Sequence, residues 1–162
     1  MTKPTVIIIM GSSHDMQHSR KIAETLNLFN IETKMHIASA HKTPEALLKI
    51  ISTYEMDKIP KIYITVAGRS NALSGFVDGQ VTAPVIACPP LSQEFSTVDI
   101  FSSLRMPSGI CLAVVLDPGN AALMAVKILS LSDNNLNNKL VDYQNKLKTS
   151  IIDADKEIQQ ND

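Results

Sequence analysis

Cysteine and aromatic residues are scarce in this sequence of 162 residues. The two cysteines, Cys88 and Cys111, show no paired spacing, so neither a disulfide framework nor a cysteine metal cluster is indicated. Each thiol is expected to be a small buried side chain. Aromatic residues make up 4% of the chain and tryptophan is absent, which argues against the stacking platforms that bind nucleic-acid bases.

An excess of charge of one sign is also missing, because 15 basic residues stand against 16 acidic ones and the net charge is −1. No broad electrostatic field is available to hold nucleic acid or an anionic membrane, so any anionic ligand has to be held locally. No apolar run approaches the roughly 20 residues that span a bilayer, and the first residues lack the apolar core of a signal peptide. We expect a cytoplasmic protein with no nucleic-acid or membrane partner.

The common nucleotide-binding loops are absent as well. Residues 11–15 follow the first apolar run but match neither Gly-x-Gly-x-x-Gly nor the loop that ends in Gly-Lys-Ser/Thr. They still form a turn of small residues before a helix, where backbone N–H groups and the helix dipole favour an anion such as phosphate. Asp15 could accept hydrogen bonds from a ribose diol or cap the helix, and its spacing does not separate the two roles.

Apolar and amphipathic segments alternate along the chain. The continuous apolar run 5–10 predicts a central strand that is covered on both faces. Further strands are expected at 33–38, 61–67, 84–88 and 111–116, and helices at 16–29, 44–54, 98–104 and 121–131, with another helix start within 68–79. This order predicts a single catalytic α/β domain over 1–162, a three-layer α/β/α sandwich with a doubly wound parallel sheet of the flavodoxin or Rossmann type.

The last thirty residues differ from the rest in composition. From Asp133 onward the chain is rich in Asn, Lys and Gln, but apolar residues recur at steps of four and three: Leu136, Leu140, Tyr143, Leu147, Ile151, Ala154 and Ile158. A narrow apolar stripe on a polar helix needs a partner surface. We expect residues 133–162 to form an oligomerisation helix that reaches a neighbouring subunit, and packing on the helix's own domain is the alternative.

Residues 39–44, Ser-Ala-His-Lys-Thr-Pro, join the second expected strand to the next helix. Thr43 followed by Pro44 predicts a helix start, because threonine can cap free backbone N–H groups and proline suits the first helical position. His41 and Lys42 then lie in a loop at the carboxyl end of a strand, where ligands bind in open α/β sheets. An accessible histidine at this place is a candidate acid or base.

The other three histidines are weaker candidates. His14 and His18 are four residues apart and could share a helix face as metal ligands, but no third ligand is evident. We therefore expect both to be exposed to solvent and predict no metal site. His36 alternates within a strand and is interpreted as structural.

Two arginines each carry the only positive charge of a strand-end segment. Arg69 lies in the glycine-rich segment 68–79 and Arg105 in the segment 105–109. Each could be a surface charge, or the two could converge on a carboxylate or phosphate, which suits the planar guanidinium group. Asp78, at the end of the first segment, is expected to cap or solvate a helix.

These motifs together resemble the phosphoribosylaminoimidazole carboxylase family of purine biosynthesis, of the PurE type. The resemblance covers nearly the whole chain, and it lies in segments 10–15, 39–44, 67–75, 87–90, 102–109 and 120–123. One branch of the family is a mutase that moves a carboxylate from the exocyclic nitrogen of carboxyaminoimidazole ribonucleotide to ring carbon C4. The other, class II, joins carbon dioxide to C4 of 5-aminoimidazole ribonucleotide directly and without ATP.

Two positions indicate the second branch. The mutase typically has arginine after the loop histidine and a second histidine in the glycine-rich loop, whereas Lys42 and Ala72 stand at these places here. The resemblance therefore implies an aminoimidazole ribonucleotide carboxylase. The mutase is the alternative enzyme, and a phosphoribosyl-ligand sensor without catalysis is the alternative outside enzymes.

The resemblance also implies roles for single residues. His41 transfers the C4 proton, Lys42 lies near the substrate phosphate, and Asp15 holds the ribose hydroxyls. The remaining substrate-binding candidates are Ser12, Ser13, Ser39, Gly68, Arg69 and Ser70, with Ala40, Ser74 and Arg105 as further ones. His14 departs from the serine usual at its place. The family implies a homo-oligomer, octamer or tetramer, that uses carbon dioxide or bicarbonate with no ATP, biotin or metal.

Overall fold

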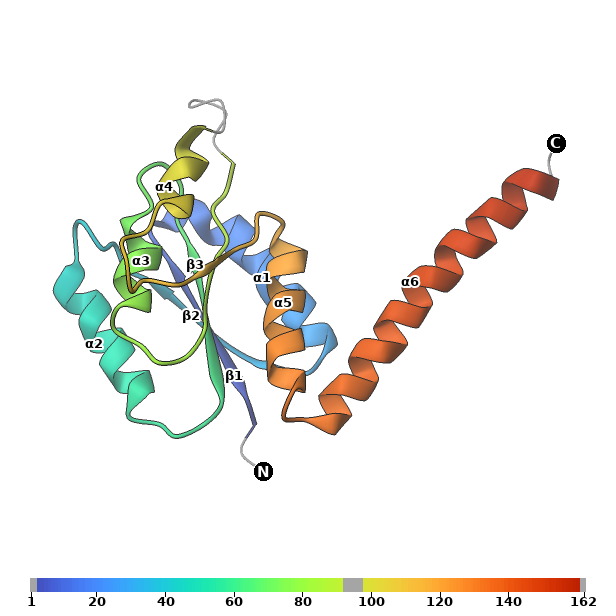
Figure 1. Ribbon diagram of the computed structural model, residues 1–162, viewed down its shortest axis with the longest axis horizontal. Helices are drawn as coiled ribbons and strands as arrows, with labels where there is room; N and C mark the ends of the chain where they lie inside the picture. Colours follow the sequence, from blue (N-terminus) through green and yellow to red (C-terminus); the bar gives the residue numbers. More distant parts are fainter. Residues whose placement is uncertain (1–2, 92–97, 161–162) are drawn as a thin grey trace.

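The chain forms a three-layer α/β/α sandwich around one parallel sheet, in a computed structural model that describes residues 3–91 and 98–160 (Figure 1). The strand order is β2-β1-β3-β4-β5, and every neighbouring pair is parallel. The strands are β1 (Thr5–Met10), β2 (Glu32–Ile37), β3 (Lys61–Val66), β4 (Val85–Ala87) and β5 (Ala113–Val114). The doubly wound sheet predicted from the alternating segments is confirmed.

β1 lies at the centre of the fold, with β2 on one side and β3 on the other. All six of its residues are buried, as a continuous β-branched run predicts for a strand covered on both faces. Val6, Ile8 and Met10 belong to the core on one face, whereas Ile7 and Ile9 belong to the core on the other. The alternation of side chains along one strand thus anchors both helical layers.

The helices divide between these two faces. Helices α1 (Met16–Leu28) and α5 (Pro118–Ser130) pack on the core that contains Ile8, and helices α2 (Pro44–Glu55) and α3 (Ala72–Asp78) pack on the core that contains Ile7 (Figure 1). A short 3-10 helix η1 (Ser13–Asp15) leads directly into α1. Each strand therefore delivers its following loop to the same edge of the sheet, at the carboxyl ends of the strands.

Two elements differ from the sequence-based expectations. The helix expected at 98–104 is a 3-10 helix η2 (Val98–Ile100) followed by a single helical turn α4 (Phe101–Leu104), and the strand expected at 111–116 is only β5. Cys111 lies before that strand, where its backbone N–H donates to Asp78 Oδ2 at 2.8 Å, and its side chain is exposed. The prediction of a buried Cys111 was wrong because the sheet does not extend to it, whereas Cys88 is buried as predicted.

Helix α6 (Asn134–Gln160) extends away from the domain (Figure 1). Its first turns pack on their own domain through the buried Leu136 and Leu140, and the ring of Tyr143 lies 5.3 Å from that of Phe29. Beyond this point the apolar stripe is exposed, with 73% of Ile151 accessible. Residues 161–162 of the expected helix lie outside the described part of the chain. No helix among the described residues is long and apolar enough to cross a membrane.

Candidate active site

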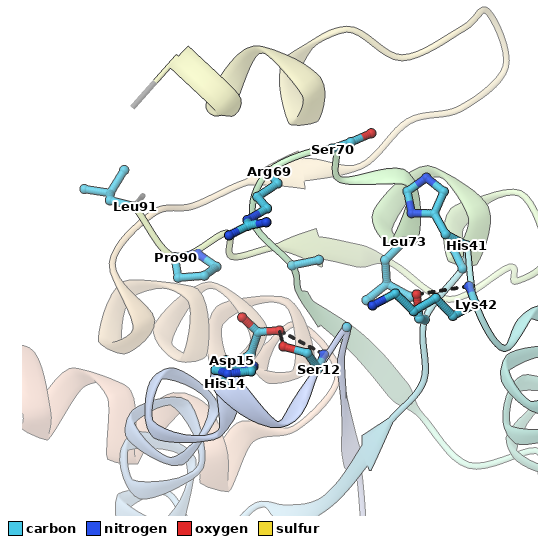
Figure 2. A pocket seen from close by; sticks show the side chains of 15 residues that line it. Ser12, His14, Asp15, His41, Lys42, Arg69, Ser70, Leu73, Pro90 and Leu91 are labelled. Carbon is cyan, nitrogen blue, oxygen red and sulfur yellow. Dashed lines mark hydrogen bonds between the residues drawn. The ribbon is translucent and has the colours of Figure 1, made fainter. Parts of the chain in front are cut away.

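A pocket of about 680 Å³ opens at the carboxyl ends of the first four strands. Side chains from four loops surround it, as Figure 2 shows for the segments after β1, β2, β3 and β4. Its volume lies in the range that accommodates small ligands and cofactors. The lining residues are Gly11, Ser12, His14, Asp15, Ser39, Ala40, His41, Lys42, Ala67, Gly68, Arg69, Ser70, Leu73, Pro90 and Leu91.

The loop after β1 contributes Ser12 and Asp15. One carboxylate oxygen of Asp15 accepts hydrogen bonds from both the backbone N–H and the hydroxyl of Ser12, each at 3.0 Å (Figure 2). This contact belongs to the capping box of η1 and holds the carboxylate at the wall of the pocket, whereas the Asp15 side chain makes no capping hydrogen bond to α1. Gly11 is packed closely here, because a Cβ atom on it would lie 3.3 Å from the Cβ atom of Ala67.

The loop after β2 presents His41 and Lys42, both exposed, at another side of the pocket (Figure 2). Ser39 organises the turn, since its hydroxyl oxygen accepts a hydrogen bond from the backbone N–H of Lys42 at 3.2 Å. Thr43 precedes α2 and Pro44 is its first residue, as predicted. The Thr43 hydroxyl does not cap the helix, however: it accepts from the backbone N–H of Ser39 at 2.9 Å and so closes the loop on itself.

The loop after β3 forms the third wall, with Gly68, Arg69 and Ser70. Arg69 has a φ of 57°, in the left-handed region that side chains disfavour. Two residues later, Asn71 is buried and is the N-cap of α3, where its side-chain oxygen accepts from the backbone N–H of Ser74 at 3.2 Å and from the Ser74 hydroxyl at 2.8 Å. The Ser74 hydroxyl also lies 2.8 Å from the Thr65 hydroxyl, so a buried polar network anchors this wall to β3.

The charges around the pocket suit an anionic ligand. Lys42 and Arg69 bring two cationic side chains from different loops, and Asp15 is the carboxylate among the lining residues. The imidazoles of His14 and His41 add two groups that can donate hydrogen bonds. The net charge of the chain is close to zero, but two cationic side chains lie at this one pocket. The local positive charge therefore favours an anion here.

Most of the residues expected at the site line this pocket, but three do not. Ser13 is exposed beside the pocket, Arg105 is exposed and outside the lining, and Ser74 is buried in the network beneath it. Sequence reasoning missed the apolar contribution of Leu73, Pro90 and Leu91. The sequence did show that the prolines after the fourth strand end that strand. Because this strand lies parallel to and beside β3, the residues that follow it could have been expected at the same edge of the sheet as the site.

His18 does not line the pocket, and it is partly buried, so its predicted exposure to solvent was wrong. Its Nε2 atom is 3.2 Å from Sγ of Cys88, the residue directly after β4. Burial lowers the pKa of His18, and Lys21 lowers it further. Burial also raises the pKa of the Cys88 thiol to about 12, so this thiol is not a nucleophile near neutral pH. No cluster of three or more potential metal ligands occurs among the described residues.

Two other side chains have contacts away from the pocket. Nε2 of His36 is 2.6 Å from the hydroxyl of Tyr54, which fits the structural interpretation of this histidine. Asp78 lies at the end of α3 and accepts the hydrogen bond from the backbone N–H of Cys111. The carboxylate therefore supports a loop, and it does not line the pocket.

Comparisons with known proteins agree with this architecture. The sequence model of the AIR carboxylase family matches residues 5–150. A phosphoribosylaminoimidazole carboxylase of Treponema denticola is 52% identical over 96% of this chain and 98% of its own length, and one of Archaeoglobus fulgidus is 51% identical over 94% and 83%. The crystal structure of Treponema denticola PurE superposes with a TM-score of 0.94 at 52% identity, over 96% of this chain and 98% of that one.

Proposed function

The chain belongs to the AIR carboxylase family of purine biosynthesis, and from this we propose that it joins carbon dioxide to C4 of 5-aminoimidazole ribonucleotide. The product is 4-carboxy-5-aminoimidazole ribonucleotide, and the reaction is reversible. The observation that carries the proposal is the placement of His41, an accessible imidazole, on a pocket wall shared with Lys42 and close to loops that bring Asp15 and Arg69.

In the proposed reaction the protein has to carry out only one proton transfer. The 5-amino group makes C4 of the substrate enamine-like, so an electron pair of the ring forms the new carbon–carbon bond to carbon dioxide. C4 then carries both a carboxylate and a proton, and His41 removes that proton to restore the aromatic ring. In the reverse direction His41 returns the proton to C4 before carbon dioxide leaves. Histidine suits both directions because it changes protonation near neutral pH.

The substrate is held by residues of separate loops. Ser12 with the adjoining backbone and Lys42 bind the phosphate, and Asp15 accepts hydrogen bonds from the ribose hydroxyls. The Asp15–Ser12 contacts place a hydroxyl, an amide and a carboxylate side by side at the wall of the pocket, and the proposal requires the Ser12 donors to turn from Asp15 to the phosphate. Ser13 is adjacent to the phosphate end, and Ser39 and Ala40 line the wall next to His41.

Carbon dioxide lies against the third wall, formed by Gly68, Arg69 and Ser70. The apolar side chains of Leu73 and Pro90 border this part of the pocket and limit the access of water. Expulsion of water strengthens the dipoles that stabilise the developing carboxylate. Since C4 is already nucleophilic, the proposal requires no ATP, biotin or metal ion.

A substrate comparison tests the proposal. Purified protein is given 5-aminoimidazole ribonucleotide and bicarbonate without ATP, and formation of the C4-carboxylated product is followed. We expect product to form from these two substrates. Activity with the nitrogen-carboxylated isomer alone would assign the chain to the mutase branch. Tight binding of the ribonucleotide with no turnover of either substrate would identify a ligand sensor.

The exposed half of α6 supports a homo-oligomer. Leu147, Ile151 and Ile158 continue the stripe that Leu136 and Leu140 bury on the domain, but 50%, 73% and 65% of these three side chains are accessible. We propose that a second copy of this chain covers them, since single domains of this size seldom expose so regular an apolar stripe. The assembly is expected in the cytoplasm and contains several subunits, with an octamer or tetramer as the expected size.

Light scattering tests this assembly. Ile151→Asp places a charge in the stripe and is expected to lower the mass of the particle, because a buried unpaired carboxylate is unfavourable. Lys148→Asp changes the charge of an exposed residue outside the stripe and serves as the control. An unchanged mass in Ile151→Asp would contradict the role of α6.

A further inference from the structure

The segment of η2 and α4 fastens the loop that forms the third wall of the pocket. Oδ2 of Asp99 accepts a hydrogen bond from the backbone N–H of Arg69 at 3.0 Å, across 30 residues of sequence. The hydroxyl of Ser102 lies 2.8 Å from the carbonyl oxygen of Arg69, across 33 residues. The N–H of Arg69 is therefore bonded to one distant segment, whereas its carbonyl oxygen competes with that of Asp99, which lies 2.7 Å from the same hydroxyl, for the one proton of Ser102.

The conformation of Arg69 explains why such support is needed. A φ of 57° is unfavourable for a residue with a side chain, because Cβ crowds the following carbonyl oxygen. Backbone conformations of this kind persist only where surrounding contacts hold them, and they occur preferentially at functional sites. The two bonds from Asp99 and Ser102 are contacts of this kind.

Asn71, two residues after Arg69, is held independently of the Asp99 side chain. The backbone N–H of Asn71 donates to the Ser102 hydroxyl at 3.0 Å, and its side-chain amide donates to the Ser103 hydroxyl at 2.8 Å. Because Asn71 is also joined to Ser74, loss of Asp99 alone leaves α3 anchored. The contact that Asp99 adds is specific to the N–H of Arg69.

Asp99 also lies behind Gly68. A Cβ atom on Gly68 would be 3.8 Å from Oδ2 of Asp99 and 3.5 Å from the carbonyl oxygen of Pro90, so the carboxylate lies beside Gly68 as well as Arg69, although it is not itself part of the lining. Figure 2 shows the side chain of Arg69 extending across the pocket toward Pro90, below the pale yellow segment of η2 and α4.

We infer that Asp99 is a positioning residue for the carboxylation. By accepting the hydrogen bond of the Arg69 N–H, it holds Gly68, Arg69 and Ser70 in the arrangement against which carbon dioxide and the new carboxylate lie. The identity of that ligand rests on the proposed function. The phosphoribosyl group is bound by other loops, so Asp99 acts on the carbon dioxide end of the pocket and leaves ribonucleotide affinity intact.

Three variants separate this role from a general structural one. Asp99→Ala removes the acceptor, whereas Asp99→Asn keeps an oxygen that can accept the same N–H without the charge. Asp78→Ala is the matched control, because Asp78 is also half-buried and its carboxylate also holds the N–H of a distant loop, at 2.8 Å, but that loop does not line the pocket. If Asp99→Ala does not fold, Asp99→Leu keeps the bulk and likewise offers no acceptor.

The first measurement is amide hydrogen exchange, which does not depend on the proposed reaction. In Asp99→Ala the amide of Arg69 is expected to exchange about tenfold to hundredfold faster than in the wild type, the range that corresponds to loss of a hydrogen bond to a charged group. Asp99→Asn should stay within about threefold of the wild type. Unchanged exchange in Asp99→Ala would overturn the inference.

The second measurement is the response to bicarbonate and to ribonucleotide. In Asp99→Ala, kcat/KM for bicarbonate is expected to fall about tenfold while the dissociation constant of 5-aminoimidazole ribonucleotide, measured by calorimetry, changes less than about twofold. Asp78→Ala should keep wild-type values. An equal loss in Asp78→Ala, or an equal loss of ribonucleotide affinity in Asp99→Ala, would contradict the positioning role. If the wild type forms no product, the proposed function fails, and hydrogen exchange alone decides whether Asp99 holds the loop.

Discussion

The carboxylate of Asp15 and the backbone and hydroxyl of Ser12 form a closed pair, with both hydrogen bonds at 3.0 Å to one carboxylate oxygen. The two residues have a structural role, because their hydrogen bonds close the turn after β1. They also line the pocket, so the same polar atoms can contact a ligand. Both donors of Ser12 are bonded to Asp15, so a phosphate that binds them has to take them from the carboxylate. The ribose hydroxyls can donate and therefore suit the carboxylate itself.

Replacement of Asp15 tests the ribose contact. Asp15→Ala is expected to raise KM for 5-aminoimidazole ribonucleotide about tenfold to hundredfold, because hydrogen bonds to a charged acceptor contribute about 1.5–3 kcal/mol. Asp15→Asn should have an intermediate effect, since its amide oxygen still accepts but carries no charge. Steady-state kinetics give both values, and Glu24→Ala, an exposed carboxylate on α1, is the control. An unchanged KM in Asp15→Ala would remove the carboxylate from substrate binding.

Lys42 is expected to act through the phosphate. Lys42→Ala should raise KM for the ribonucleotide about tenfold, and added salt should reduce the difference between the variant and the wild type because it screens the lost charge pair. Lys49→Ala removes an exposed cation from α2 outside the pocket and should have no such effect. The role would be contradicted if the phosphate-free nucleoside lost as much affinity as the nucleotide in Lys42→Ala.

The His18–Cys88 contact predicts a pH dependence of stability. Because burial lowers the pKa of His18 in the folded protein, the unfolded chain binds a proton first as the pH falls. The contribution of neutral His18 is therefore complete above its unfolded pKa of about 6.5 and is lost as the pH falls through that value toward the lower folded one. His18→Gln should lose less stability between pH 7.5 and pH 5 than the wild type does.

Urea unfolding at several pH values measures this difference. His36 contributes in the same direction, since burial also lowers its pKa, and it remains in both proteins being compared. Parallel curves of unfolding free energy against pH for the wild type and His18→Gln would show that His18 is not the group responsible.

The fold and three walls of the pocket could be predicted because they depend on local pattern. A continuous run rich in β-branched residues such as 5–10 favours a strand covered on both sides, and the loops that follow parallel strands meet at one edge. His41 became a candidate in this way, from its position between a strand and a helix start, whereas the pattern left Arg69 open and Gly68 was a candidate through the resemblance alone.

The features that were missed depend on contacts between distant segments. His18 and Cys88 are 70 residues apart and Asp99 and Arg69 are 30 apart, so no periodicity in the sequence connects them. Cys111 was misplaced because the length of an edge strand depends on its one neighbour. The first turns of α6 pack on the domain and its later turns are exposed, so contact of the later turns with a neighbouring subunit stays a prediction.

The proton transfer assigned to His41 is the central claim, and His41→Asn tests it most directly. Rates of carboxylation and of decarboxylation are measured with the wild type and the variant, together with ribonucleotide affinity and the melting temperature. We predict that both rates fall about 10²-fold to 10⁴-fold, the usual contribution of a positioned acid or base, while affinity and melting temperature stay close to those of the wild type. Near-normal turnover in a folded His41→Asn protein would contradict the account.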